Sequence, residues 1–288
     1  MSYGPNPWVQ QHWDFRAAMN FIGGGAGCGL LIASALAGGP RTLQQACLLL
    51  GLALVGVGLL HVWAEIGRPW RALNVFINPG QSWMSREAWV APWLMLAGAA
   101  ALFFWPVAAG LAAVLAAAFL YCQARILQAS KGIAAWREPR LIPLIVVTGL
   151  AEGLGLFVLL AAFWQGLDVG AALTLGGLLL LRLLAAQRWR AALAAGRTPT
   201  RTLTACDRAL RPLYAGSVVA LALLPLALLL PPGVAAAAQA LAGLVAALGG
   251  GVFKFLLVTR AAFNQGFALP HLPVRGVRRS SATHGATE

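Results

Sequence analysis

The chain has 288 residues, of which 60% are hydrophobic and 10% charged, and its mean hydropathy is +0.76. Soluble domains carry about a quarter charged residues, so this composition excludes soluble enzyme folds and indicates an integral membrane protein. The formal charge of +13 would suggest nucleic-acid binding in a soluble protein. In a membrane protein, basic loops between spans are expected, and we predict no nucleic-acid partner.

Residues 1–20 contain prolines, tryptophans and an acid where a signal peptide has a basic start followed by an apolar stretch. We therefore predict a retained, ordered tail. A bilayer core about 30 Å thick requires about 20 apolar residues in each helical span. By this measure the sequence predicts an all-α integral membrane protein with eight transmembrane helices, at residues 17–37, 43–66, 88–106, 108–128, 141–164, 168–186, 213–231 and 234–258.

Two connections between these spans contain proline, at Trp105-Pro106 and at Pro231-Pro232-Gly233. Because proline ends one helix and starts the next, we expect tight turns at both. Seventeen of the 21 lysines and arginines fall on one side of the spans, whereas the loops of the opposite side have only Arg41. We predict that both termini are cytoplasmic and that the protein lies in the inner (cytoplasmic) membrane.

Residues 24–31 resemble residues 149–156, at an offset of 125 residues. The similarity suggests two four-helix units of like orientation. Small residues also recur in membrane helices because they let helices approach closely, and that explanation stays open. The organisation we predict is a cytoplasmic tail at 1–16, a first four-helix bundle at 17–128, a cytoplasmic loop at 129–140, a second four-helix bundle at 141–258 and a cytoplasmic tail at 259–288.

A polar hinge joins the second and third spans. His61 and Glu65 are four residues apart at the cytoplasmic end of span two, so they share one helix face, and both can exchange protons. Ser85 is expected to cap span three, where Glu87 is favoured by the helix dipole. Ionisable pairs at membrane depth are costly, and we interpret His61 and Glu65 as functional rather than structural.

Other polar residues gather at the same end of the first four spans. They are Arg16 and Asn20 in span one, and Tyr121, Gln123 and Arg125 in span four. Hydrogen-bond donors and proton carriers that open on lipid suit a quinone, whose ring oxygens accept hydrogen bonds while its tail stays in the bilayer. The alternative is that these are interfacial side chains that snorkel to the headgroups, which we favour for Arg16, Arg71 and Arg125.

Haem is the rival cofactor. A haem held between helices needs a pair of histidines within spans, and of His12, His61, His271 and His284 only His61 lies in one. The four cysteines include no C-x-x-C pair and no Cys/His pair at metal-ligand spacing. We predict no haem, no iron–sulfur cluster and no structural zinc. Any redox role then requires a metal-bearing partner on the cytoplasmic face.

Two ionisable residues lie deeper in the second half. Glu152 is near the middle of span five, and Lys254 is within span eight. We predict an intramembrane ionisable pair. A structural ion pair and a proton relay are both compatible with it.

The chain resembles the membrane-anchor subunits of dimethyl sulfoxide reductase-type molybdoenzymes, within the polysulfide reductase membrane-subunit superfamily. The resemblance rests on Gly67-Arg68-Pro69-Trp70-Arg71-Ala72-Leu73-Asn74, on Ser82-Trp83-Met84-Ser85-Arg86-Glu87 and on eight spans. Residues 13–29 and 259–267 look more particularly like the membrane subunit of phenylacetyl-CoA:acceptor oxidoreductase.

The resemblance implies two four-helix bundles, ubiquinone or menaquinone as the chain's own ligand, a partner with four [4Fe–4S] clusters and a catalytic subunit with a molybdenum or tungsten pterin. Anchors of exported enzymes have external termini, so cytoplasmic termini favour a cytoplasmic substrate such as an acyl-CoA or sulfite. We therefore expect a quinone-reactive anchor subunit, with His61 and Glu65 as catalytic residues and Asn20, Arg68, Trp83, Arg86 and Glu87 as quinone-binding residues. The alternatives are the anchor of a sulfite dehydrogenase or other molybdoenzyme and, in a different class, a transporter or proton channel that uses Glu152 and Lys254.

Overall fold

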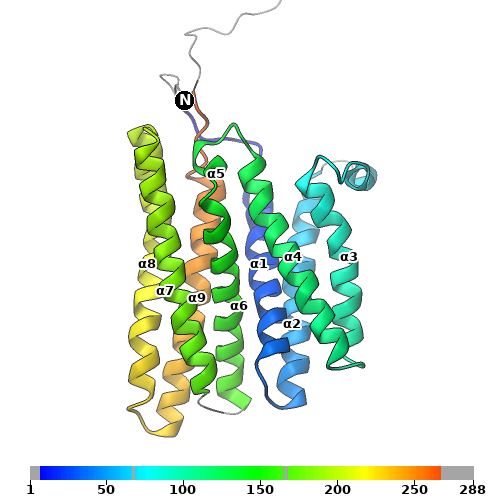
Figure 1. Cartoon of the computed structure of the whole chain (residues 1–288), viewed down its shortest axis with the longest axis vertical. Helices are drawn as coiled ribbons and strands as arrows, with labels where there is room; N and C mark the ends of the chain where they lie inside the picture. The colour runs from blue at the N-terminus through cyan, green and yellow to red at the C-terminus, as the bar shows by residue number, and fades with distance from the viewer. Residues whose placement is uncertain (1–6, 67–68, 165, 167, 267–288) are drawn as a thin grey trace, which may run out of the picture.

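The structure is a computed structural model and describes residues 7–66, 69–164, 166 and 168–266. No β-strand occurs in these ranges, apart from isolated bridges. The helices, labelled as in Figure 1, are α1 (Phe15–Leu36), α2 (Arg41–Glu65), the 3-10 helix η1 (Pro69–Phe76), α3 (Trp83–Ala101), α4 (Val107–Ala129), α5 (Ala134–Arg137), α6 (Leu141–Trp164), α7 (Val169–Ala195), α8 (Thr200–Ala227) and α9 (Pro232–Thr259).

Seven helices of the described chain are long and apolar enough to cross a membrane, namely α1, α2, α4, α6, α7, α8 and α9. This confirms the prediction of an all-helical, multi-pass membrane protein. The helix α3 is not among the seven. It has 19 residues, and its first turns contain Arg86 and Glu87.

The helices α1 and α6 lie side by side at the centre of the molecule (Figure 1). The helix α1 also contacts α2, α4 and α9, while α6 also contacts α4, α7 and α9. A Cβ atom on Gly153 of α6 would overlap the backbone of Gly29 in α1. Small residues therefore permit this close approach, and the two segments that resemble one another in sequence lie against each other.

The largest differences from the predicted spans are in α3, α7 and α8, and α3 also ends five residues earlier than predicted, at Ala101. The helix α3 begins five residues earlier than predicted, because Ser82 and not Ser85 is its N-cap and accepts a hydrogen bond from the Ser85 backbone N–H at 3.3 Å. The helices α7 and α8 extend well beyond the apolar stretches, with a short turn at 196–199 between them. In these extensions the carboxylate of Asp207 accepts hydrogen bonds from Arg190, at 2.5 Å and 2.9 Å.

The chain segments next to the N-terminus pack over one end of the bundle. Trp13 stacks on Trp136, with ring centroids 5.0 Å apart, and the Trp136 indole N–H donates to the carbonyl oxygen of Leu257 at 3.2 Å. Val9 forms a β-bridge with Phe263, and Ile133 forms one with Asn264. The described part of the N-terminal tail is thus ordered against the predicted 129–140 loop, which contains α5.

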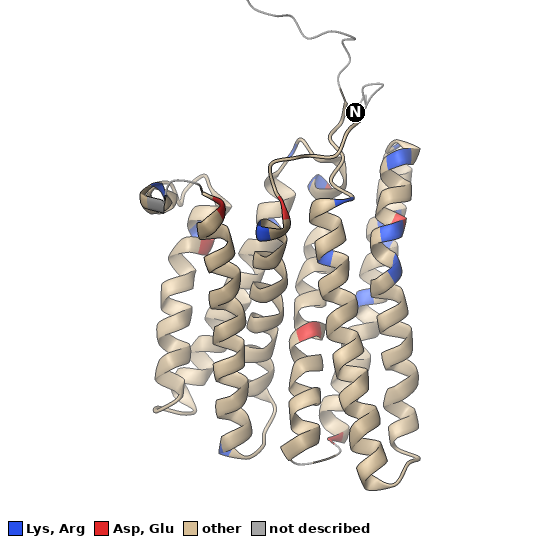
Figure 2. Ribbon diagram, turned by 180° about the vertical axis from the view of Figure 1, so that it is seen from behind, with Lys and Arg blue, Asp and Glu red and all other residues tan. Residues whose placement is uncertain are grey.

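Charged side chains gather at the end of the molecule where the N-terminus lies, as Figure 2 shows. At the opposite end, the Arg41 guanidinium donates hydrogen bonds to the carbonyl oxygens of Ala101 and Leu102 at the end of α3, at 3.0 Å and 2.7 Å. Asp168 caps α7 by accepting from the Ala171 N–H at 2.9 Å. Each of these two charged side chains therefore forms hydrogen bonds with backbone groups at a helix end, where such groups have no partner within the helix.

Candidate functional site

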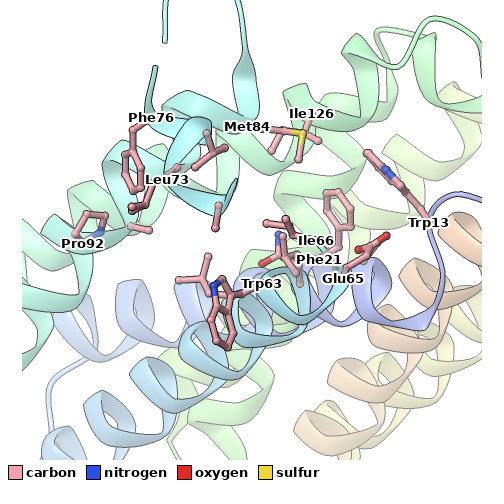
Figure 3. A pocket seen from close by; sticks show the side chains of 18 of the residues that line it. Trp13, Phe21, Trp63, Glu65, Ile66, Leu73, Phe76, Met84, Pro92 and Ile126 are labelled. Carbon is pink, nitrogen blue, oxygen red and sulfur yellow. The ribbon is translucent and has the colours of Figure 1, made fainter. Parts of the chain in front are cut away.

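An apolar cavity of about 620 Å³ lies between α1, α2, η1 and α3, at the charged end of the molecule (Figure 3). Aromatic and aliphatic side chains form most of its wall. Among the carboxyl, amide, hydroxyl and cationic side chains of the described residues, only Asn20 and Glu65 line it. The described wall of the cavity is therefore apolar except for Asn20, which can form hydrogen bonds, and Glu65, which can exchange protons. This combination is typical of sites for apolar ligands with a polar head.

The helix η1 forms the outer wall of this cavity. Leu73 and Phe76 line the cavity from η1, and the Trp89 indole N–H of α3 donates to the Phe76 carbonyl oxygen at 3.1 Å. The Phe76 and Trp89 rings meet edge to face, with centroids 5.5 Å apart. Trp70 is 87% exposed on the same short helix, as expected for an aromatic side chain at a membrane interface.

Asn20, at the wall of the cavity, is the centre of a cluster of buried polar side chains. It is 4% exposed, and its side-chain amide donates to Glu87 Oε1 at 3.3 Å. The Gln123 amide of α4 donates to the Asn20 backbone carbonyl at 2.8 Å. The Asn20 Oδ1 atom is buried and has no hydrogen-bond partner among the described residues. Asn20 therefore retains an unpaired polar atom while its amide group is fixed by Glu87.

Glu65 and His61 take different positions. Glu65 is half-buried and lines the cavity from the last turn of α2. His61 does not line it: its Nδ1 lies 2.8 Å from the Val57 carbonyl oxygen, and its ring meets the edge of Phe15 with centroids 6.2 Å apart. Among the described residues no hydrogen bond joins His61 to Glu65. The structure thus brings Glu65 to the cavity and leaves His61 one helical turn away on the surface of α2.

Two charged residues at the start of α1, Asp14 and Arg16, lie near the end of α2 that carries Glu65. The Arg16 side chain donates to the backbone carbonyl of Ala64 at 3.1 Å and forms an ion pair with Asp14 at 2.9 Å. The hydrogen bond from the Arg16 guanidinium lowers the pKa of the Asp14 carboxyl below its usual value. Asp14 is therefore a fixed anion that holds Arg16 beside the end of α2.

Trp83 and Arg86 lie away from the apolar cavity. The Arg86 guanidinium donates to the carbonyl oxygens of Pro79 and Gly80, both at 2.8 Å, and so closes the loop before α3. The guanidinium groups of Arg86 and Arg125 both lie over the Trp83 ring, with Cζ atoms 4.1 Å and 4.4 Å from its centroid. Met84 lines the cavity from this segment instead. The predicted quinone-binding residue Arg68 lies outside the described residues.

The predicted pair of Glu152 and Lys254 is formed. Lys254 Nζ donates to Glu152 Oε2 at 2.5 Å and to the Phe21 carbonyl oxygen at 3.0 Å, and both side chains are 1% exposed. Gly25 of α1 leaves the room for the ammonium group, because a Cβ there would overlap Nζ. Glu152 Oε1 and the hydroxyl of Thr148 are buried and have no hydrogen-bond partner in the described chain.

Sequence reasoning assigned no role to Arg182. It is fully buried in α7, where it donates to the Ser217 hydroxyl at 2.6 Å and 3.0 Å and to the Ala246 carbonyl at 2.9 Å. The signal that could have found it is a single arginine inside an apolar run, since such residues pair with neighbouring helices.

No three His, Cys, Asp or Glu side chains of the described residues come together as a metal site, and all four cysteines are buried with free thiols. The comparisons with known proteins give no family: no family model matches the chain, and neither does any curated protein.

Proposed function

We propose that this chain is the membrane-anchor and quinone-reactive subunit of an oxidoreductase complex. The observation that carries the proposal is the apolar cavity, whose wall combines Asn20 and Glu65 with aromatic and aliphatic side chains. Its volume of about 620 Å³ lies within the range typical of small-molecule sites. The apolar wall suits a quinone ring and the first units of its tail.

In this proposal each polar residue of the cavity has one role. A quinone accepts two electrons and two protons from its surroundings when it is reduced. One N–H of the Asn20 amide is held by Glu87, and its second N–H donates a hydrogen bond to a ring oxygen. Glu65 exchanges protons at the cavity wall, and His61, one turn earlier on α2, passes them to and from the aqueous surface.

The membrane arrangement is part of the same proposal. We infer that α3 is an eighth transmembrane helix and that two four-helix bundles, α1–α4 and α6–α9, make up the chain. The helix contacts support this, since α1 meets α2 and α4 much as α6 meets α7 and α9. The excess of basic residues at the end with the N-terminus supports cytoplasmic termini in the inner membrane.

The proposed partners dock on the cytoplasmic end, beside the cavity. They are a subunit with four [4Fe–4S] clusters and a catalytic subunit with a molybdenum or tungsten pterin, as in the molybdoenzymes whose anchors this chain resembles. With cytoplasmic termini, the substrate is a cytoplasmic compound such as phenylacetyl-CoA, and sulfite or another molybdoenzyme substrate is the alternative. The chain is not catalytic alone.

One observation favours a second candidate of another class. Glu152 is buried near the middle of α6, and its Oε1 atom has no hydrogen-bond partner among the residues that the structure describes. A buried carboxylate of this kind is typical of proton pathways in transporters and channels. A transporter needs no iron–sulfur partner, so metal analysis of the complex purified from its native membrane separates the two candidates.

The cavity itself can be tested on the purified chain. Ala88 lines it, and Ala88→Phe fills part of it, whereas Ala99→Phe adds the same group at an exposed position of the same helix. We expect Ala88→Phe to weaken binding of a quinone analogue by at least about tenfold, since steric exclusion from an apolar pocket has effects of this size. Ala99→Phe should bind like the parent, and equal binding by both variants would move the site elsewhere.

A further inference from the structure

A second cavity, of about 720 Å³, is lined in part by α5, which lies at the same end of the molecule (Figure 1). It is bounded by the last turns of α4 and α7 and by the segment that leads into α6. Unlike the apolar cavity, it is lined by several charged side chains, which are Arg125, Lys131, Arg137 and Glu138.

Arg125 is held in place at the wall of this basic cavity. Its guanidinium lies over the Trp83 ring, with 4.4 Å from Cζ to the centroid, and donates to the Tyr121 hydroxyl at 2.9 Å. The Arg125 Nε atom is buried and has no hydrogen-bond partner among the described residues. A guanidinium that is already oriented by an aromatic ring and a hydroxyl group is well suited to bind an anionic oxygen.

The basic cavity also has an excess of positive charge. Among the described residues that line it, Glu138 is the one acidic residue, and Arg140, outside the lining, lies 3.7 Å from that carboxylate. Within the described chain, no carboxylate pairs with Arg125 or Lys131, while Arg137 donates to the Gln265 side chain at 2.8 Å. The cavity therefore lacks an internal counterion for at least two of its cations.

We propose that the basic cavity binds the phosphate headgroup of an anionic phospholipid. It lies at the level of the helix ends, where headgroups meet a membrane protein, and basic pockets between helices bind such groups. Apolar surface continues from it along α6: Pro139 lines the cavity, and Pro143, Val146 and Leu150 follow at the spacing of one helix face. Pro143 is exposed and the other two are half-buried, which leaves room for acyl chains. A soluble phosphate would use the cations and not this surface. The proposal is independent of the quinone function.

The test is lipid retention by the purified full chain in detergent, measured by native mass spectrometry. Phosphatidylglycerol and phosphatidylcholine with identical acyl chains are the probes. We expect preferential retention of phosphatidylglycerol, and about 25-fold weaker retention by the double variant Arg125→Gln/Lys131→Gln, at about fivefold for each basic residue near an anionic lipid. The matched control, Arg208→Gln/Arg211→Gln, removes the same charge from exposed positions of α8 and should retain the lipid like the parent.

Several results would overturn the proposal. Equal retention of the two lipids by the parent chain decides against it without any variant, and so does an equal loss in the α8 control. Competition by millimolar inorganic phosphate that removes the lipid would make this a site for a soluble anion. If the double variant keeps its lipid and loses a co-purifying protein, the cavity is a protein contact. The variant Arg125→Lys/Lys131→Arg keeps both charges and should keep preferential binding of phosphatidylglycerol, and loss of that preference in a folded protein contradicts an electrostatic site.

Discussion

The ion pair between Lys254 and Glu152 makes a sharp prediction about stability. Both side chains are 1% exposed and their charged atoms are 2.5 Å apart, so neither charge has access to water in the folded chain. In Lys254→Met the Glu152 carboxylate loses its cation, and the Phe21 carbonyl loses a donor. Removing one partner of a buried pair costs about 3–5 kcal/mol of folding free energy, and we expect a loss in that range.

The double variant Glu152→Leu/Lys254→Met removes both charges. Replacing a buried pair by apolar residues of similar volume is often neutral or stabilising, so we expect the double variant to be more stable than Lys254→Met by about 2–4 kcal/mol. The assay is unfolding in mixed detergent micelles, followed by helical circular dichroism. Lys131→Met is the matched control, because it removes an exposed lysine and should change stability by less than about 0.5 kcal/mol. The reasoning would be refuted if the double variant lost as much stability as the sum of the losses in Glu152→Leu and Lys254→Met. A loss below about 1 kcal/mol in Lys254→Met would refute it as well.

Three further predictions concern orientation, haem and Arg182. A reporter fused after Glu288 should be active only in the cytoplasm, because the uneven distribution of basic residues over the predicted loops favours cytoplasmic termini, and periplasmic activity would reverse the topology. The purified chain should show no haem b band of stoichiometric amplitude in a reduced-minus-oxidised spectrum, since only one histidine lies in a predicted span. Ser217→Ala removes the acceptor of two Arg182 hydrogen bonds, so we expect a loss of about 1–3 kcal/mol in micelle unfolding, and an unchanged stability would show that Arg182 has other partners.

The helical membrane fold could be predicted because apolar length is a local property of the sequence. The ends of the helices are harder to predict from the sequence. Apolar length places the end of α7 near residue 186, yet the helix continues to Ala195. Its extension is held by contacts that are distant in sequence: the Trp189 indole donates to Ala135, and Arg190 pairs with Asp207.

The candidate site was predictable in part. Helical spacing correctly puts His61 and Glu65 near each other on α2, but it does not decide which side chain faces a cavity that α1 and η1 enclose. The sequence indicates that Asn20 and Glu87 are polar residues at the same end of the spans, and their hydrogen bond joins α1 to α3. Trp83 lies against Arg125 of α4 rather than in the apolar cavity, a result that depends on tertiary packing and has no signal in the spacing of residues.

The most direct test of the proposed quinone site uses the intact complex with Glu65→Gln. This substitution keeps the shape of the side chain at the cavity wall and removes its proton exchange, a role worth about 10²- to 10⁴-fold in rate for general acid–base groups. We predict that quinone-linked turnover falls by that factor, while electron transfer from substrate to a soluble artificial acceptor stays at the parental rate because it bypasses the cavity. Quinone-linked turnover at the parental rate would contradict the assignment of quinone chemistry to the cavity of Asn20 and Glu65.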